Sequence, residues 1–149
     1  MPKILVIYHS QQFGDTKVLA DAVAEGARKS GAGVELVNTN ERRVTLDEYL
    51  DADAVAVGTP DYFSYIAGTI KTFFDDLYLW DKAGRPVKGK PAAFFYSCGG
   101  GGRVKHPFET LAVKFFRQVG ETLESRRPAT DEIIEKCRAL GGELAQGMG

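Results

Sequence analysis

Short apolar runs alternate with amphipathic patterns along this chain, and that alternation restricts its fold more than any other feature. The first run, KILVIY at Lys3–Tyr8, is almost continuously apolar, as expected of a strand that is covered on both faces. Similar runs follow at Val34–Asn38, Ala54–Gly58 and Ala92–Ser97. Strands separated by helices form parallel sheets through right-handed crossovers, with helices on both faces. The pattern therefore predicts an α/β fold with a doubly wound parallel sheet.

Apolar residues at helical spacing separate these runs. They predict helices at Thr16–Lys29, Ile66–Leu77, Phe108–Val119 and Ile133–Leu144, and only a turn or two of helix within residues 42–50. A weak polar segment at 121–125 precedes the last helix, and five strands in one sheet is the simplest arrangement. The chain contains no repeat, low-complexity segment or linker, so we expect a single domain over residues 1–149.

The composition argues against several classes of partner. The formal net charge is −1, from 19 basic and 20 acidic side chains, so no electrostatic attraction to nucleic acid is implied. The longest apolar run near the N-terminus, Ile4–Tyr8, is too short to span a bilayer or to form a signal-peptide core. We therefore expect a cytoplasmic protein with no membrane partner.

The cysteines and histidines do not form a metal-binding pattern. Cys98 and Cys137 have neither the close spacing of a zinc site nor the density of a disulfide scaffold. Cys137 falls on the apolar side of the last helix, where a core position is expected. His9 and His106 are not spaced for metal binding with a nearby thiol or carboxylate, so we assign no metal.

Ligands of open parallel sheets bind beyond the carboxyl ends of the strands, so the segments after the strands are the places to look for a site. The first of them, HSQQFGDT at 9–16, offers hydroxyls, amides and a glycine where a helix begins. The free N–H groups and the dipole of a helix N-terminus can hold a phosphate without a basic side chain. The simpler alternative is that Asp15 or Thr16 only caps the helix.

The second and third segments carry aromatic residues and glycines. GTPDYFSY at 58–65 places Tyr62 and Phe63 just beyond a strand, where aromatic rings could cover a flat heterocycle or only pack on the core. SCGGGGR at 97–103 follows the fourth strand. The loops are not a dinucleotide fingerprint, because GxGxxG is absent and Asn38 and Thr39, not an acidic residue, close the second strand. The Walker-like segment at 84–91 ends in Pro91 and precedes a strand, so we interpret it as a turn.

Taken together, the three segments give the chain a family resemblance. Ser10, Gly14 and Thr16, the pattern GTPxYF and the segment at 89–103 resemble the flavodoxin-like FMN-binding superfamily, and most closely its NAD(P)H:quinone oxidoreductase and NADPH-dependent FMN reductase branches. The match in the order of elements covers essentially the whole chain. The resemblance implies a five-stranded sheet of order 2-1-3-4-5, and FMN as the cofactor.

The resemblance also implies a role for each loop. The phosphate would be surrounded by Ser10, Gln12, Gly14, Asp15 and Thr16, with Phe13 in the same cofactor-binding loop. The isoalloxazine ring would be flanked by Pro60, Asp61, Tyr62, Phe63 and Ser64, and its polar edge would be lined by Ser97, Cys98, Gly99, Gly100, Gly101 and Gly102. The redox chemistry belongs to the flavin, so no catalytic side chain is assigned.

Two departures from the family pattern leave the function open. Gly14 lies four residues after Ser10, one more than is usual, so Gln11, Gln12 or Phe13 must bulge outward. The chain also lacks the insertions of the quinone oxidoreductases, which fits a simple carrier better. Its nearly neutral charge argues against a carrier, because dedicated flavodoxins are usually acidic. The resemblance favours transfer of electrons from NAD(P)H through FMN to a quinone-like acceptor, and Arg103, Lys105 and His106 could receive an NADPH phosphate. The alternative is a flavodoxin-type one-electron carrier that docks to a redox protein partner. A homo-oligomer is compatible with either function.

Overall fold

The sheet is built around β1 (Lys3–Tyr8), which is paired along both edges. The computed structural model describes residues 1–11 and 14–147, and all its strand pairs are parallel. β1 pairs with β2 (Gly33–Asn38) on one side and with β3 (Ala54–Pro60) on the other. β3 in turn pairs with β4 (Lys90–Cys98), which gives the order β2-β1-β3-β4-β5. The predicted doubly wound parallel α/β fold and its 2-1-3-4-5 order are confirmed, but the sheet has six strands and not the five predicted.

The fifth position of the sheet is shared by two short strands. β5 (Phe116–Gln118) pairs with the beginning of β4, with Phe116 opposite Lys90. β6 (Leu123–Arg126) pairs with the end of β4, where Cys98 is opposite Arg126. Both run parallel to β4, so the chain leaves the sheet edge after Gln118 and returns to it at Leu123.

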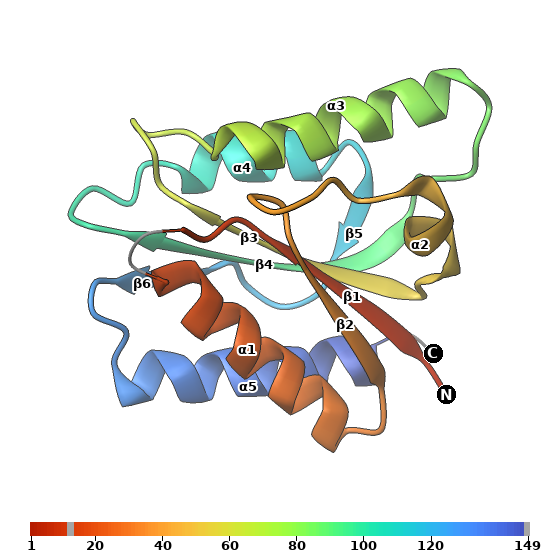
Figure 1. The fold of residues 1–149 in the computed structure, drawn as a ribbon. Helices are drawn as coiled ribbons and strands as arrows, with labels where there is room; N and C mark the ends of the chain where they lie inside the picture. The colour runs from red at the N-terminus through yellow and green to blue at the C-terminus, as the bar shows by residue number, and fades with distance from the viewer. Residues whose placement is uncertain (12–13, 148–149) are drawn as a thin grey trace.

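Helices cover both faces of the sheet, as Figure 1 shows. α1 (Asp15–Lys29) and α5 (Asp131–Gln146) cover one face, and α2 (Leu46–Asp51), α3 (Gly68–Lys82) and α4 (Lys105–Ala112) cover the other. The α1/α5 face buries mostly aliphatic side chains and includes Cys137, which is a core residue as predicted. The other face holds the aromatic cluster Tyr49, Phe73, Phe74, Phe94, Phe108, Phe115 and Phe116.

The prediction of a helix from Phe108 to Val119 is wrong in its second half. α4 ends at Ala112, and Phe116 begins β5. Phe115 and Phe116 are still buried in the aromatic cluster, but they reach it from a turn and a strand. The main-chain carbonyl of Phe115 accepts a hydrogen bond from Gly89 N at 2.7 Å, and the pairing of β5 with β4 outweighs continuation of the helix.

Two glycines allow α1 and α5 to pack against each other at short range. A Cβ on Gly26 of α1 would overlap the carbonyl oxygen of Arg138, and a Cβ on Gly141 of α5 would overlap that of Val23. Both obstacles are main-chain atoms, which cannot rotate away. The contact of the two helices therefore requires glycine at both positions.

Substitution of Gly141 by alanine is expected to lower the free energy of unfolding by about 1–3 kcal/mol, because the added methyl must push the two helices apart. Gly142 provides a matched control in the same helix, since a Cβ there would lie 3.2 Å from the Ser30 hydroxyl and at an ordinary 3.7 Å from Gly26 O. Gly142→Ala should be neutral or stabilising through its better helix propensity. Urea denaturation of both variants measures the difference, and equal effects would contradict the close-packing account.

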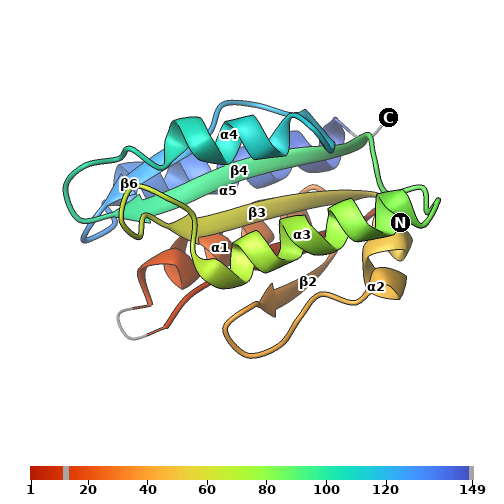
Figure 2. The ribbon, with the colours of Figure 1, turned by 90° about the horizontal axis from the view of Figure 1, so that it is seen from above.

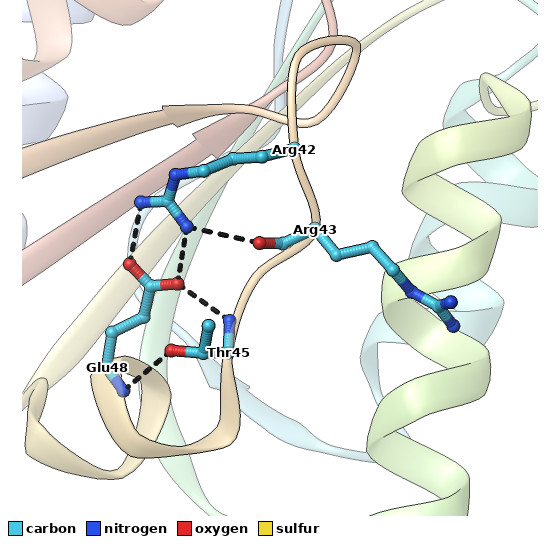
Figure 3. Close-up of polar contacts among 4 residues, drawn as sticks. All are labelled: Arg42, Arg43, Thr45 and Glu48. Atoms are coloured by element: carbon cyan, nitrogen blue, oxygen red, sulfur yellow. Dashed lines mark hydrogen bonds and ion pairs between the residues drawn. The ribbon is translucent and has the colours of Figure 1, made fainter.

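The connection from β2 to β3 is fixed by a capping box on α2 (Figure 3). The Thr45 hydroxyl accepts a hydrogen bond from Glu48 N at 3.2 Å, and the Glu48 carboxylate accepts one from Thr45 N at 2.7 Å. Arg42 donates to both oxygens of the same carboxylate, at 2.8 and 2.9 Å. The Arg42 hydrogen bond is the main reason that the pKa of Glu48 falls from its usual 4.5 to about 2.

A pKa lowered by folding makes the contribution of Glu48 to stability pH-dependent. The carboxylate contributes fully above about pH 4.5, and this contribution is lost as the pH falls toward 2. Glu48→Gln should therefore lower the free energy of unfolding at pH 7 by about 1–2 kcal/mol. The difference in this free energy between variant and wild type should shrink as the pH falls below about 4.5. Glu41→Gln, at an exposed position of the same segment, serves as the control in denaturation at several pH values. A Glu48→Gln difference that does not change with pH would contradict this account.

Candidate functional site

The loops that follow β1, β3 and β4 meet at one end of the molecule, away from both termini (Figure 2). Parallel strands end on the same side, and the pairing of Tyr8 with Gly58 and of Pro60 with Ser97 brings these ends level. Between the loops lies a cleft of about 350 Å³, within the range of small-molecule sites. It is lined by Ser10, Gln11, Gly14, Asp15, Thr16, Pro60, Asp61, Tyr62, Ser97, Cys98, Gly99 and Arg127.

The wall of the cleft formed by the first loop is the beginning of α1. Gly14 is the N-cap residue, with a φ of 68°, a conformation that glycine adopts without strain. Gly14 has no side chain to cap the helix, and Asp15 and Thr16 lie inside the helix, so the alternative that one of them serves as its cap is wrong. The Ser10 hydroxyl accepts a hydrogen bond from Lys17 N at 3.3 Å. The main-chain N–H groups of Asp15 and Thr16 find no acceptor within residues 1–11 and 14–147. The helix thus begins at the cleft with unsatisfied donors.

Side-chain hydrogen bonds hold the first loop in place. The Asn38 side chain accepts from Ser10 N at 3.1 Å and donates to Ser10 O at 3.0 Å, which ties the loop to the end of β2. The buried Thr16 hydroxyl lies 2.8 Å from the Ser97 hydroxyl at the end of β4. Two of the three loops are therefore joined directly beneath the cleft.

The second loop is a tight hairpin in a strained conformation. Tyr62 and Tyr65 exchange main-chain hydrogen bonds of 3.0 and 3.1 Å, and the two residues between them have positive φ angles, 57° at Phe63 and 63° at Ser64. Hairpins of this type favour Asn and Gly at these two positions. The turn carries Phe63 at its tip, where the ring is fully exposed. Such strain is concentrated at functional sites in many proteins.

Asp61 and Tyr62 connect the hairpin to its neighbours. The Asp61 carboxylate accepts hydrogen bonds from Ser64 N at 2.8 Å and from Val104 N at 3.2 Å, so it bridges the second and third loops. The Tyr62 hydroxyl accepts from the Gln11 side chain at 2.7 Å. The Tyr62 ring stands at 80° to that of His9, with centroids 5.7 Å apart. The ring is therefore fixed from two sides along the wall of the cleft.

His9 supports Tyr62 from a buried position. Its Nδ1 lies 2.6 Å from the Thr69 hydroxyl, while its Nε2 is buried without a partner within the described part of the chain. Burial lowers the pKa of the His9 imidazole, which favours the neutral form at physiological pH.

The third loop leaves β4 with Cys98 buried at its beginning. Burial raises the pKa of the Cys98 thiol, so the protonated form is favoured and a packing role is supported over a reactive one. Tyr96 donates a hydrogen bond to Glu124 of β6 at 2.9 Å, which links this end of β4 to the neighbouring strand. Burial is also the main reason that the pKa of Tyr96 is raised.

The geometry of the cleft is that of a small-molecule site at the switch point of a parallel sheet, and sequence comparison decides the family. The sequence profile of NADPH-dependent FMN reductases matches residues 2–113. The chain belongs to the NADPH-dependent FMN reductase family. A flavodoxin from Aquifex aeolicus (strain VF5) is 34% identical over 98% of this chain and 86% of its own length. The predicted flavodoxin-like membership and FMN as the cofactor are confirmed.

Solved structures agree on the fold of this FMN reductase family member. A flavodoxin from the domain Archaea has a TM-score of 0.85 at 24% identity, and the match covers 98% of both chains. Rubredoxin oxygen:oxidoreductase from Desulfovibrio gigas has a TM-score of 0.83 at 20% identity, covering 98% of this chain and 36% of that one. At these identities the likeness concerns the fold alone.

The cleft of the FMN reductase family member brings together most of the predicted site residues. Ten of them line it, and these are Ser10, Gly14, Asp15, Thr16, Pro60, Asp61, Tyr62, Ser97, Cys98 and Gly99. Five others lie on the same loops but do not line the cleft, namely Phe63, Ser64, Gly100, Gly101 and Gly102. Gln12 and Phe13 lie outside the described residues. Contact of any of these residues with FMN remains a prediction.

Sequence analysis missed two of the residues that line the cleft. Gln11 was named only as one of three residues of which one must bulge outward; it lines the cleft, and its side chain donates a hydrogen bond to the Tyr62 hydroxyl. Arg127 follows β6, a strand too polar to be recognised with certainty from its sequence. Since β6 ends on the same side as the other strands, a basic residue directly after it could have been assigned to the site.

The described residues hold no group of three or more His, Cys, Asp or Glu side chains that could bind a metal ion. Over the same residues, the FMN reductase family member has no helix with the length and apolar character needed to cross a membrane.

The strained hairpin leads to a stability prediction. Ser64→Gly should raise the free energy of unfolding by about 1 kcal/mol, because glycine adopts a φ of 63° without steric cost. Ser30→Gly is the control, since Ser30 has a φ of −91° and glycine there should lower stability by about 0.5 kcal/mol. Chemical denaturation measures both, and a destabilised Ser64→Gly variant would contradict the strain at the hairpin.

Proposed function

We propose that this chain binds FMN in the cleft and acts as an electron carrier between redox partners. The observation that carries the proposal is the beginning of α1, where the N–H groups of Asp15 and Thr16 find no acceptor among the described residues and both residues line the cleft together with Ser10. Main-chain donors at a helix N-terminus are suited to a phosphate group. The open conformation of Gly14, with no atom within 4 Å of its missing Cβ, leaves room for a ligand to approach the backbone.

The rest of the cleft suits a flavin ring. In this proposal the Tyr62 ring and Pro60 form one side, and the third loop from Ser97 to Gly99 offers main-chain groups to the polar edge. Phe63 and Ser64 at the hairpin tip, together with Gly100, Gly101 and Gly102, form the rim. Gln12 and Phe13 complete the phosphate loop in the proposal.

FMN, when bound, supplies the electron-transfer chemistry, and the protein supplies position and environment. The Thr16–Ser97 hydrogen bond fixes the spacing between the phosphate loop and the third loop. Asp61 fixes the hairpin against the third loop, so that the wall carrying Tyr62 keeps its place. No side chain of the cleft needs to act as an acid or base.

The carrier function is favoured by the flavodoxin of Aquifex aeolicus, which matches nearly the whole chain at 34% identity. The fully exposed Phe63 ring next to the cleft is a second point in its favour, since an exposed apolar side chain beside a redox site suits contact with a protein partner. The absence of the insertions typical of quinone oxidoreductases agrees with this function.

An NAD(P)H oxidoreductase that reduces a quinone-like acceptor is the second candidate. The match to the NADPH-dependent FMN reductase family favours it. Arg103, Lys105 and His106 are exposed on the third loop and at the beginning of α4, where they could receive the phosphate of NADPH.

Anaerobic reduction distinguishes the two candidates. The protein is loaded with FMN, freed of unbound flavin and mixed with NADPH or NADH while the visible flavin absorbance is recorded. For a carrier we expect stable retention of FMN, slow or absent bleaching by either nucleotide, and rapid bleaching by dithionite. Rapid bleaching by NADPH, with recovery when a quinone is added, would instead establish the oxidoreductase.

A variant pair tests whether FMN occupies this cleft. Thr16→Val keeps the side-chain shape but removes the hydroxyl that lies 2.8 Å from Ser97, so it should retain less FMN after gel filtration. Thr110→Val, at an exposed position of α4, is the control. Failure of the wild type to retain flavin, or equal retention by both variants, would count against the site.

A further inference from the structure

Arg127 is the only cationic side chain among the described residues that line the cleft. The lining also includes two acidic side chains, Asp15 and Asp61. A phosphate dianion entering the cleft would therefore meet two carboxylates and one guanidinium of opposite charge. Arg127 follows β6, whereas the three loops described above follow β1, β3 and β4.

The position of Arg127 is fixed by the sheet. β6 pairs with β4 so that Arg126 lies opposite Cys98, and Arg127 N donates a hydrogen bond to Cys98 O at 3.0 Å. The main chain of Arg127 is thus anchored at the end of β4, directly beside the cleft. The anchor does not depend on the side chain.

The guanidinium extends from this anchor toward the beginning of α1. Its Nε lies 3.6 Å from the Asp15 carboxylate, and the two side chains are 46% and 29% exposed. An ion pair of this length and exposure contributes little to stability by itself. Asp15 is the first residue of α1, where the first N–H groups find no acceptor among the described residues.

Gly99 makes room for this arrangement. A Cβ at Gly99 would lie 3.0 Å from Nη2 of Arg127, closer than a carbon and a nitrogen normally approach. The glycine at the start of the third loop therefore allows the guanidinium to lie across the cleft between that loop and α1.

We propose that Arg127 binds the phosphate group of the flavin, as a charged partner to the main-chain donors of α1. The inference rests on the proposed function, because it needs FMN in the cleft. Guanidinium groups form paired, charge-assisted hydrogen bonds with phosphate, which are stronger than the loose contact with Asp15. On binding, the guanidinium exchanges its Asp15 contact for the phosphate and also reduces the repulsion between Asp15 and the dianion.

The test compares FMN with riboflavin, which lacks the phosphate, by quenching of flavin fluorescence on binding. Arg127→Gln should weaken FMN binding roughly tenfold or more and leave riboflavin binding unchanged. Arg127→Lys should fall between wild type and Arg127→Gln, because it keeps the charge but not the planar fork. Arg126→Gln is the matched control, since Arg126 is 66% exposed, pairs with Glu124 and does not line the cleft.

Several outcomes would overturn the proposal. If Arg127→Gln weakens the binding of FMN and of riboflavin equally, Arg127 contacts another part of the flavin. If the variant keeps its FMN affinity but is reduced less by NADPH than by NADH, Arg127 contacts the nucleotide instead. If Arg127→Gln has no effect in an Asp15→Asn background, Arg127 acts only by neutralising Asp15. A wild type that binds FMN no better than riboflavin would refute the phosphate site itself, whereas discrimination that survives Arg127→Gln refutes only the role of Arg127. Circular dichroism and thermal melts of each variant verify that it is folded.

Discussion

The parallel pairing of β1, β3 and β4 is the constraint on which the site depends. Tyr8 lies opposite Gly58, and Pro60 lies opposite Ser97, so the three strands end at the same level. The loops after β1, β3 and β4 therefore start side by side, and single side-chain contacts are enough to join one loop to the next. The Thr16–Ser97 hydrogen bond and the Asp61 contacts with Ser64 and Val104 are of this kind.

Within the described residues, an unsatisfied helix N-terminus and strained backbone lie next to each other at this end of the sheet. α1 begins at Gly14, which has no side chain to cap it, and the N–H groups of Asp15 and Thr16 find no acceptor among the described residues. The hairpin next to it holds two residues other than glycine at positive φ. Unsatisfied main-chain donors and strained backbone beside a cleft suit the binding of a ligand.

Much of this could be predicted from the sequence, for identifiable reasons. The strand at Lys3–Tyr8 matches its observed bounds because a fully buried strand is apolar at nearly every position. The end of α4 could not be predicted, because Phe115 and Phe116 continue its helical spacing and no glycine or proline interrupts it. Residues that serve the same core from a turn or strand produce the same pattern as residues on a helix.

For the site, the sequence by itself determined the kinds of group available: hydroxyls and a glycine before α1, aromatic residues after β3, and glycines after β4. It could do so because each loop is a contiguous stretch next to a recognisable strand. Only the tertiary structure decided which members line the cleft, placing Tyr62 on its wall and Phe63 in solvent through the turn between them. It also added Arg127, because the pairing of β6 with β4 is a contact between distant segments, and the polar sequence of β6 carries little of the hydrophobic signal that reveals buried strands.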